Sequence, residues 1–168
     1  AIASVYQSWL SPKAALYREK HHISETAGTA VTVQRMVWGN SVKEAAGAGV
    51  LLPRDPMKFS DEPVIVFSPH AQGTEVVSDT ATAPQVPLPS FSHPRREELR
   101  RIATLLHEYH RKIPQDIEFT DDGNSIWILQ TRELPLSNLA LFRSLVEQTN
   151  DGLTTNEALR VISAQQLE

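Results

Sequence analysis

The sequence has no cysteine among its 168 residues. This absence excludes a disulfide framework, a thiolate zinc site, an iron–sulfur cluster and a cysteine nucleophile. Long hydrophobic runs are also lacking, since runs such as 49–52 and 64–67 are far too short to cross a bilayer. Basic residues are outnumbered, with 16 Lys plus Arg against 20 Asp plus Glu, and the resulting charge argues against a broad nucleic-acid-binding surface.

The residues that are present are typical of a folded domain. The hydrophobic fraction of 40% is enough for a core, and the length fits one domain with a small appendage. The chain begins at Ala1 with no initiator methionine and no signal-peptide pattern, so we expect either processing or a piece of a longer protein.

Hydrophobic periodicity and turn residues predict an α+β fold with an antiparallel sheet and helices packed on it. The first helical stretch carries an apolar stripe from Ile2 to Leu10, and Ser11 with Pro12 predicts the cap of a second helix. The predicted helices cover residues 1–22, 95–112, 138–148 and a last turn after Thr154, whereas the predicted strands cover 29–38, 50–52, 64–67, 115–120 and 126–131. Residues 78–94 are small, polar and rich in proline, which predicts a surface loop.

The segment 115–132 predicts a hairpin with chemically distinct faces. Asp116 and Glu118 alternate with Ile117 and Phe119, so the two carboxylates share one face of their strand. The turn 121–124 then reverses the chain.

On the returning strand, we expect Trp127 and Leu129 to be buried beside the apolar residues of the first strand. This register places Gln130 and Arg132 on the carboxylate face, and it requires a loop of about five residues or a bulge. Carboxylate and amide oxygens suit Mg²⁺, and arginine suits a phosphate. The alternative is a solvated sheet face with cross-strand ion pairs, which antiparallel sheets often have.

Other candidate sites have weaker support. Gly47 and Gly49 could bring backbone amides to a phosphate, although such a pair is more often a turn. His107 and His110 lack the spacing of a zinc protease, so a surface or packing role is favoured. No Ser/His pair indicates a nucleophilic hydrolase.

The hairpin segment resembles the end of the nucleotide-binding domain of the pyruvate, phosphate dikinase family. Residues 115–120 read QDIEFT and residues 127–132 read WILQTR, where the family pattern is QDIEFT, a glycine and then LQTR. Thr131 favours the dikinase branch, because phosphoenolpyruvate synthases and rifampicin phosphotransferases tend to read QAR or QSR there. The resemblance continues in residues 28–40 (GTAVTVQRMVWGN), 49–56 (GVLLPRDP), 71–77 (AQGTEVV) and 151–161 (DGLTTNEALRV).

The resemblance implies the C-terminal part of an ATP-grasp nucleotide-binding domain that holds ATP and Mg²⁺. Carried over by motif, Asp116, Glu118 and Gln130 would bind Mg²⁺ and the ATP phosphates, and Arg132 would have a catalytic role beside the phosphates. The adenine pocket and the ribose contact would come from Gln34, Met36, Val37 and Glu75.

The resemblance also implies partners for this chain. Residues 1–134 would be the C-terminal half of the ATP-grasp domain, and residues 135–168 would be a helical linker toward a phosphohistidine domain. An N-terminal ATP-grasp subdomain would complete the nucleotide site, and the phosphoryl group would pass through a histidine to pyruvate, forming phosphoenolpyruvate. This chain alone would be inactive. We expect a cytoplasmic protein that binds neither nucleic acid nor membrane, and whose isolated chain forms homo-oligomers through surface that the missing subdomain would cover.

Departures from the family motifs leave two other functions open. Acidic, basic and glycine-loop positions of the family are changed at 53, 57–60, 66, 74, 81 and 133–137. These changes favour a degenerate, non-catalytic relative that serves as a binding or regulatory module. The third hypothesis is a related phosphotransferase with a different phosphoryl acceptor, because other domains would recognise that acceptor.

Overall fold

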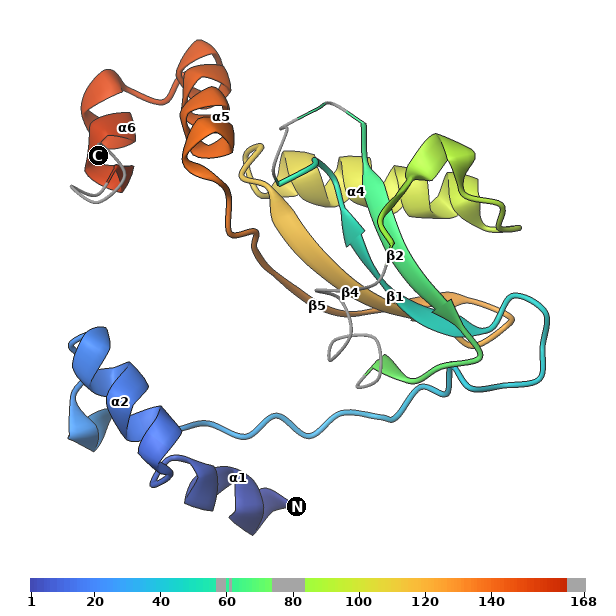
Figure 1. The fold of residues 1–168 in the computed structure, drawn as a ribbon, viewed down its shortest axis with the longest axis horizontal. Coiled ribbons are helices and arrows are strands. Elements are labelled where there is room, and N and C mark those ends of the chain that lie inside the picture. Colours follow the sequence, from blue (N-terminus) through green and yellow to red (C-terminus); the bar gives the residue numbers. More distant parts are fainter. Residues whose placement is uncertain (57–59, 61, 74–83, 163–168) are drawn as a thin grey trace. The chain divides into compact units, whose positions relative to one another are not determined.

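The computed structural model describes residues 1–56, 60, 62–73 and 84–162, with the side chains of 160 and 161 left out. The chain divides into two compact units, Ala1–Met36 and Val37–Glu168. Both units can be followed along the ribbon in Figure 1.

The first unit contains α1 (Ile2–Ser8), α2 (Pro12–Lys20) and a 3₁₀ turn, η1 (Glu25–Ala27). The predicted cap is confirmed, because the Ser11 side chain accepts a hydrogen bond from the Ala14 amide at 3.3 Å with proline at the start of α2. Arg18 is buried, lies 4.2 Å from the Trp9 ring and donates to the Trp9 carbonyl oxygen at 2.6 Å.

The predicted burial of the α1 stripe is wrong within this chain. Ile2 is 55% exposed and Leu10 is 79% exposed, and α1 has no buried residue. The following helix, α2, contacts Trp9 through an arginine, and its own apolar residues Leu16 and Tyr17 are also exposed, so the two helices do not bury the stripe between them.

The strand predicted at residues 29–38 is also wrong, because the segment has no regular secondary structure. Its β-branched and aromatic residues remain largely exposed, Val33 at 79% and Trp38 at 59%. High β-propensity produces a strand only where a neighbouring strand supplies hydrogen bonds and packing, and this segment crosses the boundary between the two units.

The second unit is built on a five-stranded antiparallel sheet, so the α+β class is confirmed. Its strands are paired in the order β3-β2-β1-β4-β5. Their bounds are β1 (Gly47–Leu52), β2 (Val64–Pro69), β3 (Val86–Pro87), β4 (Gln115–Asp121) and β5 (Ile126–Glu133). The four strands predicted in this unit are therefore present; three are one or two residues longer than predicted, and β1 begins three residues earlier, at Gly47.

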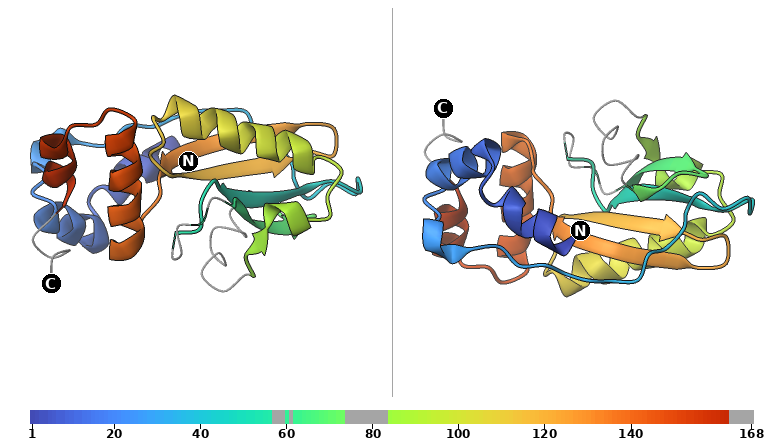
Figure 2. Two further views of the ribbon diagram at one scale, coloured as in Figure 1. Left: turned by 90° about the horizontal axis from the view of Figure 1, so that it is seen from above. Right: turned by 90° about the horizontal axis from the view of Figure 1, so that it is seen from below.

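One face of the sheet is covered by α4 (Arg96–Tyr109), as Figure 2 shows. Leu99 and Ala103 of this helix are buried against Leu51, Ile117 and Phe119 of the central strands. The predicted helix is thus confirmed, although the expected seam residue at its last turn, Tyr109, is 78% exposed. The helix ends where Arg111 and Lys112 adopt positive φ angles, a conformation that no α-helix continues.

The described part of the predicted surface loop contains β3 and a 3₁₀ turn, η2 (Leu88–Ser90). Leu88 is buried in the α4-side core, and its amide donates to the Pro63 carbonyl oxygen at 2.8 Å. The loop is therefore fastened to the sheet edge instead of lying free on the surface.

The opposite face of the sheet carries a smaller apolar cluster. Its buried members are Ala48, Val50, Leu52, Val64, Val66 and Ala71. Beyond the sheet lie α5 (Asn138–Asn150) and α6 (Thr155–Val161), the latter with the predicted capping box between Thr154 and Glu157. Two ion pairs join the C-terminal end of α5 to residues just outside β1 and β4. Arg54 pairs with Glu147 at 3.0 Å, and Lys112 pairs with Asp151 at 2.8 Å.

Candidate functional site

The β4–β5 hairpin brings the four predicted polar residues together. Asp116 pairs with Arg132 across the two strands, and Glu118 pairs with Gln130. Because side chains alternate along a strand, these two cross-strand pairs share the face turned away from α4. The prediction that these four side chains share one face of the hairpin is therefore confirmed.

A bulge in β5 changes the register beyond this face. The ladder shifts between Glu118 and Phe119, so that Phe119 pairs with Ile128 and Leu129 is the extra residue. Beyond the bulge the parity of β5 is reversed. The expected burial of Trp127 beside the core is therefore wrong: the residue pairs with Thr120, lies on the polar face and is 44% exposed.

The strongest contact on the polar face is a two-point ion pair. Arg132 donates from Nε and Nη2 to Oδ2 of Asp116, at 2.8 and 2.6 Å. This hydrogen bond, with the charge of the same carboxylate, raises the pKa of Arg132 further above its ordinary value. The Asp116 side chain is only 9% exposed, whereas the Arg132 side chain is 57% exposed.

Among the described residues, the second oxygen of Asp116 is a buried acceptor with no hydrogen-bond partner. Buried carboxylate oxygens are normally satisfied, so this atom is an exception that a bound ligand would remove. Together with half-buried Glu118 and exposed Gln130, it offers three hard oxygen donors on one face, a set that fits Mg²⁺ if water or phosphate completes the coordination. Among the described residues there is no cluster of three or more acidic or histidine side chains placed to hold a metal without such help.

The remaining predicted nucleotide-site residues lie outside the hairpin in the sequence. Gln34 and Met36 are exposed and belong to the first unit, whereas Val37 is half-buried and begins the second. Glu75 lies outside the described residues. Their assignment to an adenine and ribose pocket stays a prediction.

The two weaker candidates are structural. Gly47 and Gly49 lie inside β1, and a Cβ on either would fall within 3 Å of neighbouring atoms, which shows that these glycines permit close packing of the sheet. Both ring nitrogens of His107 are buried without a hydrogen-bond partner, and burial, with Arg54 nearby, lowers its pKa.

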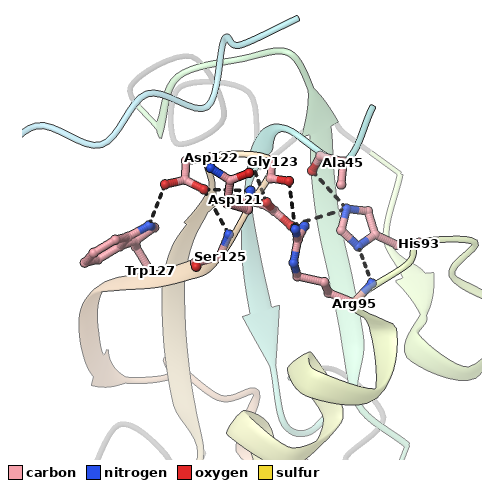
Figure 3. Close-up of polar contacts among 9 residues, drawn as sticks. Ala45, His93, Arg95, Asp121, Asp122, Gly123, Ser125 and Trp127 are labelled. Atoms are coloured by element: carbon pink, nitrogen blue, oxygen red, sulfur yellow. Dashed lines mark hydrogen bonds and ion pairs between the residues drawn. The ribbon is translucent and has the colours of Figure 1, made fainter. Parts of the chain in front are cut away.

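A second polar cluster, which the sequence did not reveal, is centred on the fully buried Asp121 (Figure 3). Arg95 donates to Asp121 Oδ2 at 2.6 Å and to the Gly123 carbonyl oxygen at 2.8 Å, while the Gly123 amide donates to Asp121 Oδ1 at 2.7 Å. His93 accepts from the Arg95 amide at 3.2 Å, which leaves its Nε2–H to donate to the Ala45 carbonyl oxygen at 3.1 Å. Each polar group has a partner, so this cluster joins the hairpin turn to the start of α4.

The turn itself is fixed by Asp122. Its carboxylate accepts from the amides of Asn124 and Ser125, which lowers its pKa, and from the indole nitrogen of Trp127 at 3.0 Å (Figure 3). The turn and the Trp127 ring are therefore held in one orientation beside the polar face.

Comparison with known sequences gives the family. The family model described as "Pyruvate phosphate dikinase, AMP/ATP-binding domain" matches residues 1–90. The chain is 35% identical over 167 residues to pyruvate, phosphate dikinase of Rickettsia conorii, covering 94% of this chain and 18% of the relative. It is 34% identical over 170 residues to the chloroplastic enzyme of Flaveria trinervia and 36% identical over 154 residues to one from Zea mays, covering 100% and 91% of this chain, and 18% and 16% of those relatives.

The comparisons also refine where the chain belongs. It spans less than a fifth of these relatives, in the N-terminal region and not in the C-terminal part of the whole enzyme. Among the described residues no helix is long and apolar enough to cross a membrane. A cytoplasmic location stays a prediction, since two of these relatives are named chloroplastic. On the match to more than half of its residues, the chain belongs to the AMP/ATP-binding domain family of pyruvate phosphate dikinase.

Proposed function

We propose that this chain supplies one side of the Mg·ATP site of a dikinase-like phosphotransferase. Residues 1–134 would be the second half of an ATP-grasp domain, and residues 135–168 would lead to a phosphohistidine domain of the parent protein. The observation that carries the proposal is the shared face of Asp116, Glu118, Gln130 and Arg132, with a buried carboxylate oxygen that has no partner.

The proposed roles follow from the chemistry of each side chain. Asp116, Glu118 and Gln130 hold Mg²⁺ and, through it, the phosphates. Arg132 contributes a planar cation to the phosphate oxygens. Phosphoryl transfer depends mainly on positioning and on neutralising the phosphate charge, which bound Mg²⁺ supplies together with this arginine.

The nucleoside end of the site rests on the family motifs. Gln34, Met36 and Val37 are assigned to adenine and Glu75 to ribose because they match the family pattern in residues 28–40 and 71–77. The phosphoryl acceptor would be a histidine on another domain, and the final acceptor would be pyruvate.

A second candidate function, a non-catalytic binding module, is favoured by one observation. Val66, at a position where the family carries an acid, is 4% exposed in the apolar cluster on the same sheet face as Glu118. Its neighbour Val50 pairs with both residues, one on each side, so the polar site borders a dry patch.

Isothermal titration of ATP, with and without Mg²⁺, into this chain joined to the N-terminal subdomain that would complete its site distinguishes the two functions. We expect Mg²⁺-dependent binding that Glu118→Gln abolishes and that Glu133→Gln leaves unchanged. Glu133 is a matched control, because it lies on β5 with the same charge but at a position of opposite parity from Arg132. A folded protein, checked by circular dichroism, that binds no Mg·ATP would contradict the enzymatic proposal and favour the binding module.

A further inference from the structure

The ion pair between Asp116 and Arg132 joins two residues that the proposed function assigns to ligands of opposite charge. The carboxylate is assigned to the cation and the guanidinium to the phosphate anion. In the structure they are bound to one another, through Nε at 2.8 Å and Nη2 at 2.6 Å on the same oxygen. Neither ligand can take its full set of contacts while this pair persists.

The two partners differ in their freedom to move. Asp116 lies on β4, an interior strand of the sheet, with 9% of its side chain exposed, whereas Arg132 lies on β5, an outer strand of the sheet, with 57% of its side chain exposed. The arginine is therefore the member that can leave, and the carboxylate remains fixed.

A divalent cation approaching Asp116 meets a guanidinium that already occupies Oδ2. Repulsion between two cations on one carboxylate is strong at a poorly solvated site, because little water screens it. Glu118 adds a second negative charge that attracts Arg132, so the arginine is held on this face until another anion competes for it.

On the basis of the proposed function, we infer that Arg132 is a built-in substitute cation that couples metal binding to phosphate binding. Without nucleotide, it neutralises Asp116 and keeps the affinity for free divalent cations low. When a polyphosphate arrives, the guanidinium turns to the phosphate oxygens, and the metal ion takes its place on Asp116. Metal and nucleotide thus bind as a pair, and each raises the affinity for the other.

The test uses the chain joined to the N-terminal subdomain that would complete its site, and measures free Mn²⁺ by electron paramagnetic resonance, with and without ATP. We expect the native protein to bind Mn²⁺ weakly alone and much more tightly with ATP. Arg132→Met should bind Mn²⁺ alone about tenfold more tightly than the native protein, and Mn·ATP more weakly, so that the coupling is lost. Arg132→Lys keeps the positive charge but not the planar fork, so it should restore weak binding of free Mn²⁺ and recover little of the Mn·ATP affinity.

Arg101→Met is the matched control, because Arg101 is exposed on α4, across the sheet from the polar face. It should change neither affinity. If the native protein binds Mn·ATP but Arg132→Met binds free Mn²⁺ no more tightly than the native protein does, the coupling inference is wrong and the proposed function stands. If the folded native protein binds no Mn·ATP, the proposed function fails and the inference with it.

Discussion

Because of the bulge in β5, we expect truncation of two aromatic residues of the hairpin to have very different effects on the free energy of unfolding. Phe119 is 1% exposed, and its ring is stacked on Phe67 with centroids 6.1 Å apart. The ring also fills the space above Gly49, where a Cβ would lie 2.7 Å from it. Trp127 is 44% exposed, and its indole nitrogen donates to the carboxylate of Asp122 in the turn.

The expected costs of truncation differ accordingly. Phe119→Ala removes a fully packed ring and leaves a cavity, which should lower the free energy of unfolding by about 3–5 kcal/mol. Trp127→Ala removes a half-exposed ring and a surface hydrogen bond, which should cost less than about 2 kcal/mol. In a chain of this length, each kcal/mol corresponds to a Tm change of roughly 2–4 °C.

Urea and thermal unfolding followed by circular dichroism measure both variants against the native protein. Trp127→Phe is a useful control, since it keeps the aromatic ring and loses only the bond to Asp122. If Trp127→Ala destabilised the protein as much as Phe119→Ala, the bulge would be misplaced and the tryptophan would belong to the core.

Three further predictions test other parts of the second unit. Asp121→Asn should destabilise it by about 3–5 kcal/mol in urea unfolding, because Arg95 loses a buried charged partner; an effect below about 1 kcal/mol would contradict the role of this cluster as a fastening. Gly49→Ala should cost about 1–3 kcal/mol, since its Cβ would lie 2.6 Å from a main-chain oxygen of the adjacent strand, whereas Gly73→Ala, whose nearest neighbour would be 3.8 Å away, should change the Tm little. Because burial lowers the pKa of His107, the stability that its neutral ring allows is fully present above the ordinary pKa of about 6.5 and is lost progressively as the pH falls below that value through the lowered pKa of the folded state; a native protein whose pH profile of unfolding matches that of His107→Gln would refute this.

The polar face of the hairpin could be predicted because it depends on the simplest regularity of a strand. Asp116 and Glu118 are two residues apart, so any strand places them together. The partners Gln130 and Arg132 followed from matching apolar faces across one short turn. Matching the two apolar sets also predicted that the hairpin needs either a loop of about five residues or a bulge.

The position of the bulge was not predictable, because it is chosen by packing. Ile126 packs against the α4-side core, whereas Trp127 is held by the Asp122 carboxylate in the turn. Both residues are hydrophobic, so hydrophobicity alone does not indicate which of the two is buried. The Asp121 cluster was missed for a different reason. Its partner Arg95 lies 26 residues earlier, and only the docking of α4 brings the two together.

The absence of a strand at residues 29–38 shows the limit of propensity. These residues have the composition of a strand. A segment becomes a strand, however, only when a neighbouring strand forms hydrogen bonds with it. The motif in residues 28–40 therefore supports the family resemblance without showing that the segment forms a strand.

The local character of the hairpin has a consequence for the order of folding. The contacts between β4 and β5, which include the whole polar face, close across one short turn, whereas the pairing of β1 with β4 must first close the long stretch between Leu52 and Gln115. Short loops close faster, and lengthening an already long loop changes the closure entropy only slowly. We therefore expect the polar face to form before the sheet is complete, and its own closure does not depend on the length of the stretch between β1 and β4.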